Sequence, residues 1–142
     1  MAIIRLIQNR QGPIHSCTTS TGVTEAARLL AEQRIGALPV LEGDRVVGIF
    51  SERDLLYSIA QDGADALNRT VGEVMTAPAI TVHQETDALE ALGLMTRRRV
   101  RHLPVVEGER MIGFVSIGDL VKLRVEAAEA EAEAMREYIQ TA

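Results

Sequence analysis

A serine and an aspartate three positions apart occur twice in the chain, each time after a glycine and two apolar residues. The first copy, GIFSERD, contains Ser51 and Asp54, and the second, GFVSIGD, contains Ser116 and Asp119. Serine is a favoured helix N-cap, and an acidic residue three positions later completes a capping box. The same carboxylate could instead accept hydrogen bonds from both hydroxyls of a ribose, beside helix N–H groups suited to a phosphate oxygen. The residue types alone leave both interpretations open.

The glycine and the type of acid in each copy favour the binding interpretation. Gly48 and Gly113 lie where strands are expected. A glycine weakens a strand and often marks the close approach of another backbone or of a ligand. Glutamate is the usual partner in a capping box, whereas both copies here have the shorter aspartate. Capping alone therefore does not explain the whole motif.

Both copies belong to an internal repeat. A shift of 65 positions, from Gly48 to Gly113, also superposes Leu38-Pro39-Val40 on Leu103-Pro104-Val105. Self-similarity at a fixed spacing indicates that each copy is one structural unit. Two such units make up most of the 142 residues.

Each unit has the pattern of a strand, a helix, two strands and a second helix. Apolar residues recur at helical spacing from Val23 to Gln33 and again from Ala88 onward, where Asp87 and Glu90 form a plausible capping pair. Two apolar runs around a glycine turn predict a hairpin in each copy. The predicted segments are edge strands at 14–17 and 79–82, hairpins at 37–50 and 102–115, and final helices that begin at Ser51 and Ser116.

The two units are expected to fold together. A single unit of about 60 residues buries too little apolar surface to be stable alone, so we expect the repeats to pack face to face around one shared core. Residues 61–69 are polar and predict a linker. The predicted division is a first repeat with the N-terminal segment at 1–61, a second repeat at 70–122 and a C-terminal helical extension at 123–142.

The repeated sequence, from TEAARLLAEQRIGALPVLEGDRVVGIFSERDLL in the first copy to LEALGLMTRRRVRHLPVVEGERMIGFVSIGDLV in the second, resembles a tandem pair of cystathionine-β-synthase (CBS) domains. This resemblance implies an α+β fold of two pseudo-symmetric β-α-β-β-α repeats that form one Bateman module, here followed by a long C-terminal helix. It also implies regulatory binding of AMP, ADP, ATP, NAD or S-adenosylmethionine in two clefts between the repeats. In the family the motif aspartate holds the ribose, the serine assists, and the adenine lies against the strand with the apolar-Pro-apolar motif of the opposite repeat.

Carried over to this sequence, the resemblance implies two unequal clefts. The Asp54 cleft would hold the phosphates, because a guanidinium such as that of Arg101 can bind phosphate through two parallel hydrogen bonds. A phosphate in the Asp119 cleft would need Arg10, His15 or a dimer partner, and this cleft is expected to hold the adenosine end of a ligand or to stay empty. One set of residues is Ser51, Arg53, Asp54, Arg101, His102, Leu103 and Pro104, and the other is Ser116, Asp119, Ile35, Gly36, Ala37, Leu38 and Pro39.

Three further groups of residues have simpler interpretations. Arg97 and Arg98 are expected to be a solvated helix end that complements the helix dipole, whereas Arg101 is expected to contact ligand. Cys17 is expected to be a buried apolar thiol, since no neighbouring base is evident. The histidines have no ligand-like spacing, so we expect no metal site.

The C-terminal segment has the pattern of a coiled-coil helix. Its apolar or small residues recur at alternating steps of four and three. We expect this helix to pack across a homodimer interface, and the alternative is that it lies back on its own subunit. The seam residues are Val121, Val125, Ala128, Ala132, Met135 and Ile139.

Composition and missing motifs exclude several classes of function. The net charge is −5 with a pI near 5.2, which argues against a nucleic-acid partner. No apolar run is long enough for a membrane span and no signal-peptide pattern is present, so a cytoplasmic location is expected. No nucleophile elbow, phosphate loop or zinc motif is present, and we expect neither an enzyme nor a catalytic cofactor.

These expectations leave two functions. The first is a stand-alone nucleotide sensor that binds AMP, ATP or NAD and acts on an unidentified effector protein. The alternative is a constitutive dimeric adaptor that binds no nucleotide.

Overall fold

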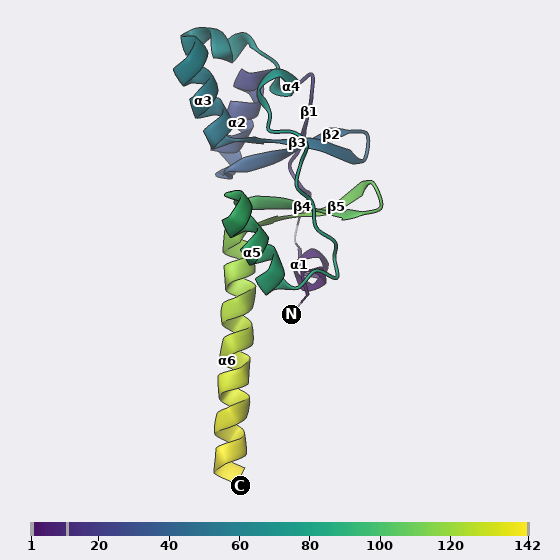
Figure 1. The fold of residues 1–142 in the computed structure, drawn as a ribbon, viewed down its shortest axis with the longest axis vertical. Helices are drawn as coiled ribbons and strands as arrows, with labels where there is room; N and C mark the ends of the chain where they lie inside the picture. Colours follow the sequence, from purple (N-terminus) through teal and green to yellow (C-terminus); the bar gives the residue numbers. More distant parts are fainter. Residues whose placement is uncertain (1, 11, 142) are drawn as a thin grey trace.

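The two repeats are plain in the computed structural model, which describes residues 2–10 and 12–141; the predicted limits at 1 and 142 lie outside them. The predicted α+β fold with two repeats and a long C-terminal helix is confirmed (Figure 1). The elements are α1 (Ile4–Gln8), β1 (Cys17–Thr18), α2 (Val23–Gln33), β2 (Ala37–Glu42), β3 (Arg45–Ser51), α3 (Glu52–Asp62), η1 (Gly63–Asn68), α4 (Val71–Val74), α5 (Ala88–Arg98), β4 (His102–Glu107), β5 (Arg110–Ser116) and α6 (Ile117–Thr141).

Two antiparallel hairpins, β2–β3 and β4–β5, form the centre of the fold. Gly43 and Gly108 occupy equivalent places in the two turns, both at a φ of 63° that glycine adopts without steric cost. The five strands form one sheet in the order β1-β2-β3-β5-β4. Arg45 and Arg110 are the register pair that joins the hairpins. The two repeats are therefore neighbours in one sheet.

The helix ends repeat as well. Helices α2 and α5 both end at an arginine in the left-handed conformation, Arg34 at φ 53° and Arg99 at φ 55°. Asp87 is the N-cap of α5, and its carboxylate accepts a hydrogen bond of 3.0 Å from the N–H of Leu89. This cap bond involves Leu89 and not the predicted partner Glu90, because the short aspartate side chain reaches the N2 amide.

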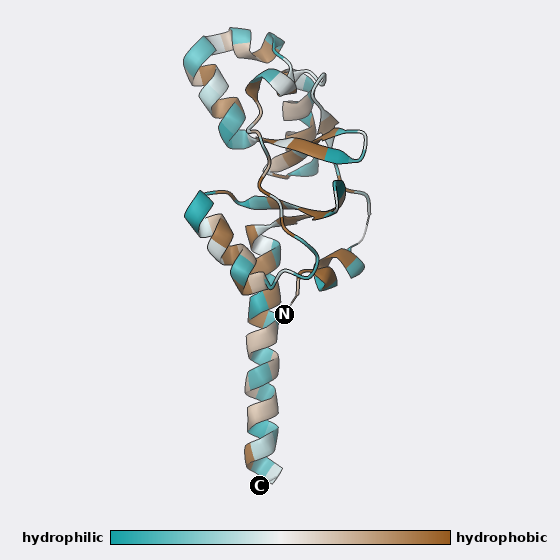
Figure 2. Ribbon diagram, turned by 45° about the vertical axis from the view of Figure 1, so that its right-hand side comes forward, coloured by the Kyte–Doolittle hydropathy of each residue, from teal (hydrophilic) through white to brown (hydrophobic). Residues whose placement is uncertain are grey.

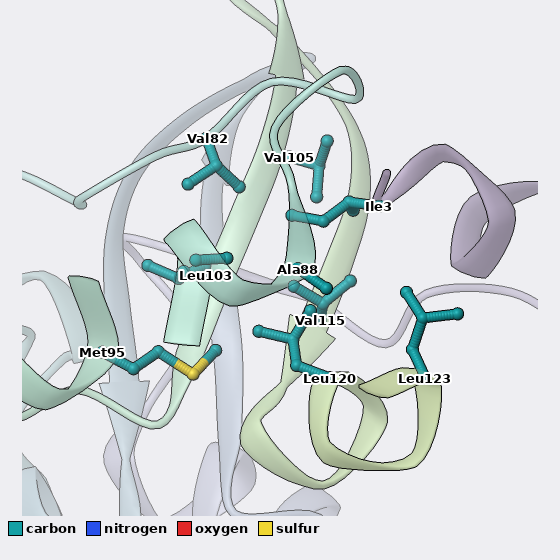
Figure 3. Packing of buried hydrophobic residues seen from close by; sticks show 10 residues of the cluster. Ile3, Val82, Ala88, Met95, Leu103, Val105, Val115, Leu120 and Leu123 are labelled. Atoms are coloured by element: carbon teal, nitrogen blue, oxygen red, sulfur yellow. The ribbon is translucent and has the colours of Figure 1, made fainter. Parts of the chain in front are cut away.

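Each repeat has its own hydrophobic core, so the expectation of one shared core was wrong. The core of the second repeat includes Leu103, Val105 and Leu120, and Ile3 from before α1 reaches into it (Figure 3). In return Val71, at the start of α4, is fully buried in the core of the first repeat. The repeats thus exchange short segments, and each completes a core that about 60 residues alone would leave too small.

Two connecting segments differ from prediction. Residues 61–69 are not a plain linker, because η1 packs on α2 and α3 and Ala66 within it is fully buried. The hydroxyl of Thr24 in α2 also donates to the carbonyl of Leu67 at 2.8 Å. The predicted strand at 79–82 is reduced to one parallel bridge between Val82 and Val105.

Helix α6 is a continuous helix that leaves the body of the molecule (Figure 1). Its first turns bury Leu120, Leu123 and Ala127 against the second repeat. Beyond Ala127 every described residue is exposed, so the alternative in which the tail lies back on its own subunit is wrong. Within the described part of the chain, no helix is long and apolar enough to cross a membrane.

Candidate functional site

A pocket of about 440 Å³ lies where the two repeats meet. The first repeat contributes Ser51 and Asp54 at the start of α3. The second contributes Arg101 and His102, where the chain leaves α5 and enters β4. The structure therefore brings together the motif residues of one repeat and the basic residues of the other, as the sequence predicted for one cleft.

Asp54 is held by three donors within the protein. Its Oδ2 accepts hydrogen bonds from the N–H of Ser51 at 2.9 Å and from the Ser51 hydroxyl at 3.0 Å. Its Oδ1 accepts from the hydroxyl of Thr76 at 2.7 Å. The N–H of Asp54 donates back to the Ser51 oxygen at 3.3 Å, which completes a capping box. A carboxylate has about four acceptor positions, so this one is fixed in place and retains capacity for a ligand hydroxyl.

The glycine of the motif is explained by the chain itself. A Cβ at Gly48 would lie 2.7 Å from Sδ of Met75 and 2.9 Å from the carbonyl oxygen of Thr76. Next to it, Ile49 and Thr76 exchange two backbone hydrogen bonds of 2.9 Å. Gly48 thus allows the segment that enters the second repeat to cross β3, and this crossing brings the Thr76 hydroxyl to Asp54.

Four arginines line the pocket that contains Asp54, and together they are called the arginine wall. Arg53, Arg98, Arg99 and Arg101 all line the pocket, together with one further acid, Glu52. The guanidinium of Arg53 donates to the carbonyl oxygen of Arg99 at 3.1 Å and so ties α3 to the end of α5. Arg98, expected to be only a solvated helix end, is part of this wall. The excess of positive charge suits an anionic group such as a phosphate.

His102 is a half-buried ring at the floor of the pocket. It stacks on Phe114 with ring centroids 5.5 Å apart and planes 14° from parallel. Burial lowers the pKa of His102, and the charge of Arg101 adds to this, while Asp119 and Glu52 act in the opposite direction. A lowered pKa keeps the ring neutral near pH 7, so His102 would meet a phosphate as a neutral hydrogen-bonding group.

A second pocket of about 320 Å³ contains Asp119. The N–H of Ser116 donates to Asp119 Oδ2 at 2.9 Å, and the N–H of Asp119 donates to the Ser116 hydroxyl at 3.1 Å. Arg10, one of the two basic residues expected here, lines this pocket with Lys122. The described residues around it do not include His15. The two pockets thus differ in their basic residues as well as in size.

Both predicted repeats match a known family. The family model described as CBS domain matches residues 7–61 and 71–126. The chain belongs to the CBS domain family.

Relatives of known structure and sequence agree with this assignment. The crystal structure of a CBS-domain containing protein from Agrobacterium tumefaciens is 33% identical, with a TM-score of 0.82 over 87% of this chain and 99% of that one. CBSX2, crystallised in complex with AMP, is 28% identical, with a TM-score of 0.71 over 81% of this chain and 90% of that one. The mitochondrial CBS domain-containing protein CBSX3 of Arabidopsis thaliana is 40% identical over 87% of this chain, which spans 63% of its length.

Seven of the predicted residues lie elsewhere than the CBS resemblance implied. Gly36 and Ala37 line the Asp54 pocket instead of the Asp119 pocket, since the Cβ position of Gly36 is 3.4 Å from Cε1 of His102. Four others are fully buried in the hairpins and do not line the pocket: Leu38, Pro39, Leu103 and Pro104. The side chains at these four positions are covered by protein and are not open to a ligand. Ile35 packs against the first core.

Two residues that line the pockets were not predicted from the sequence. Thr76 has no motif of its own, and only the crossing at Gly48 places it beside Asp54. Lys122 was assigned only to the predicted C-terminal helix. Its spacing of three residues from Asp119 places both on the same helix face and could have indicated its position in the pocket. Cys17 behaves as expected: it is buried, and desolvation together with the charge of Glu25 raises its pKa to about 11.

Proposed function

We propose that this CBS pair is a regulatory module that binds an adenosine-containing nucleotide in the Asp54 pocket and passes the bound state to an effector protein. The proposal rests on the meeting of the anchored carboxylate of the first repeat with Arg98, Arg99 and Arg101 of the second repeat in one pocket of about 440 Å³. That volume is within the range of small-molecule sites. The complex of the relative CBSX2 with AMP supports the ligand class.

The geometry suggests where the ribose and the phosphates of such a ligand would bind. The ribose hydroxyls would donate to Asp54, beside Ser51 and Thr76. The phosphates would extend to Arg101 and the other arginines, whose forked donors match phosphate oxygens. AMP, ADP, ATP and NAD all satisfy this arrangement. The work of the site is binding and not catalysis, and we assign the chain no enzymatic activity and no catalytic cofactor.

Regulation would follow from the position of the ligand between the repeats. A ligand that touches α3 from one repeat and β4 from the other binds best to one relative packing of the two, and so shifts the population toward it. The cytoplasmic location inferred from the sequence stays a prediction.

The direct test is thermal melting of the purified protein with AMP, ATP, NAD or S-adenosylmethionine. A ligand that binds only the native state adds about 2.7 kcal/mol to the free energy of unfolding at 100 times its dissociation constant, and so raises the melting midpoint. GMP serves as a control for non-specific binding of phosphate. If none of the four ligands shifts the midpoint at millimolar concentration, the sensor is contradicted and the constitutive adaptor is favoured.

A further inference from the structure

The exposed face of α6 carries an unbroken apolar seam. Four of its residues are large and open to solvent: Val121 is 46% exposed, Val125 49%, Met135 60% and Ile139 67%. Ala128 and Ala132, also exposed, complete the series. In a heptad, Val125, Ala132 and Ile139 take the a positions, and Val121, Ala128 and Met135 take the d positions. Brown patches recur along the projecting helix in Figure 2, where it touches no other element.

The seam is separate from the face that holds α6 on the body. Leu120, Leu123 and Ala127 form the stripe buried against the second repeat. At 3.6 residues per turn, this stripe lies roughly 120° around the helix from the seam. A second helix that packs on the seam would therefore not collide with the body of the subunit that carries the first helix. By symmetry, the body of the second copy would lie on the opposite side of the two paired helices.

The charged residues beside the seam favour a second copy of α6 as the partner, with the two helices parallel. In a parallel pair in register, each g position faces the e position of the next heptad on the other helix. Arg124 then faces Glu129 of the second copy, and Glu131 faces its Arg136. Both pairs occur twice by symmetry, and all four are attractive. Arg136 already contacts Glu133 of its own helix at 3.1 Å, but its five N–H donors allow both contacts.

An antiparallel pair with the same full overlap brings like charges together. Glu129 would face Glu129 of the second copy, and Glu131 would face Glu131. Lys122 would face Arg136 of the other chain, which is a repulsive pair as well. Like charges at these positions are a means by which coiled coils exclude an orientation.

We propose that α6 binds α6 of a second copy of this chain as a parallel, in-register two-stranded coiled coil from Val121 to Ile139. Valine at the first a position favours two strands, and the alanine layers at 128 and 132 allow close approach of the helices. Asp119 lies in the first turn of this same helix, so the second pocket and the coil share one rigid element. The coil would hold both modules at the same end.

Solution mass tests the coil and its location. Light scattering on the full-length protein at micromolar concentration should give twice the chain mass of 15.5 kDa. Met135→Lys combined with Ile139→Lys should reduce the mass to that of one chain. Ala130→Lys combined with Ala134→Lys adds the same charge to exposed positions outside the seam and should leave the dimer intact. A monomeric wild type, or a dimer that survives the seam variant, would overturn the proposal; the latter would point to another exposed apolar surface, such as Leu56 and Tyr57 of α3.

Cross-linking tests the direction. Met135→Cys places a thiol at a d position that meets its own copy only in the parallel register. Mild oxidation should then convert most of the dimer to a disulfide-linked species, while Cys17 stays buried and unreactive in the wild-type control. In the antiparallel register residue 135 meets residue 125. Cross-linking confined to a mixture of Met135→Cys and Val125→Cys would therefore refute the parallel arrangement.

Discussion

Asp54 has a structural role in the protein, and in the proposed function it also binds the ribose. Its carboxylate caps α3 through Ser51 and contacts the second repeat through Thr76, so it is oriented before any ligand arrives. Asp119 has the same capping bonds, but its pocket is smaller and its basic residues come from α6 and the N-terminal segment. A motif shared by the two repeats therefore lies in two pockets of different character.

The first prediction at this scale compares the two aspartates. Asp54→Ala should weaken nucleotide binding by roughly 10- to 100-fold, the range of a hydrogen bond to a charged group, whereas Asp119→Ala should have a smaller effect. Isothermal titration with AMP or ATP measures both. Each variant also loses a helix cap, at about 0.5–2 kcal/mol, so unfolding without ligand is measured alongside. An equal loss, or a larger one in Asp119→Ala, would show that the arginine wall does not decide where nucleotide binds.

The second prediction concerns His102 and pH. Its pKa in the folded protein is below the ordinary value of 6.5, so the unfolded chain binds the proton first as pH falls. The contribution of this group to stability is therefore complete above pH 6.5 and is lost as pH falls below it. Urea unfolding at pH 7.5 and pH 5.5 should show a steeper loss of stability in the wild type than in His102→Gln. Parallel losses in the two proteins would mean that the ring is not buried as described.

At the scale of elements, the repeat made much of the fold predictable. The helix at 23–33, both hairpins and the cap serines follow from spacing and turn glycines, which are local properties of the chain. The exchange of segments between repeats was not predictable, because Ile3 and Val71 look like ordinary apolar residues until tertiary contacts are known. The pocket shows the same division: Asp54 and Arg101 have a signal in the repeat, and Thr76 has none.

A substitution at Gly48 tests the close crossing of the segment with Met75 and Thr76 over β3. Gly48→Ala should destabilise the protein by about 1–3 kcal/mol, because the new Cβ would overlap Met75 and the Thr76 carbonyl as the chain crosses β3. It should also weaken nucleotide binding by displacing the Thr76 hydroxyl from Asp54. Gly118→Ala is the matched control, since its Cβ would meet only the Ser116 hydroxyl oxygen at 3.6 Å and alanine favours a helix. Chemical denaturation measures both, and a Gly48→Ala protein as stable as the wild type would rule out the tight crossing.

With the proposed ligand and the proposed coiled coil, the whole molecule would have two separate sources of added stability: a nucleotide between the repeats and a second copy along α6. The Asp54 pocket is built on α3, α5 and β4, whereas the seam is confined to α6. Sites with no shared residues usually contribute additively. Ligand binding and dimer formation should therefore be separable in one set of melting experiments.

We expect the melting midpoint of the wild type to rise with protein concentration, because unfolding of a dimer includes its dissociation. Comparing about 2 µM with about 200 µM protein should show the rise in the wild type and a constant midpoint in Met135→Lys with Ile139→Lys. Saturating AMP should shift both proteins by the same amount at both concentrations, since the seam variant leaves the Asp54 pocket unchanged. A constant wild-type midpoint would contradict the proposed dimer but not the proposed binding of nucleotide. A nucleotide shift that disappears in the seam variant would instead show that the pocket is complete only in the dimer.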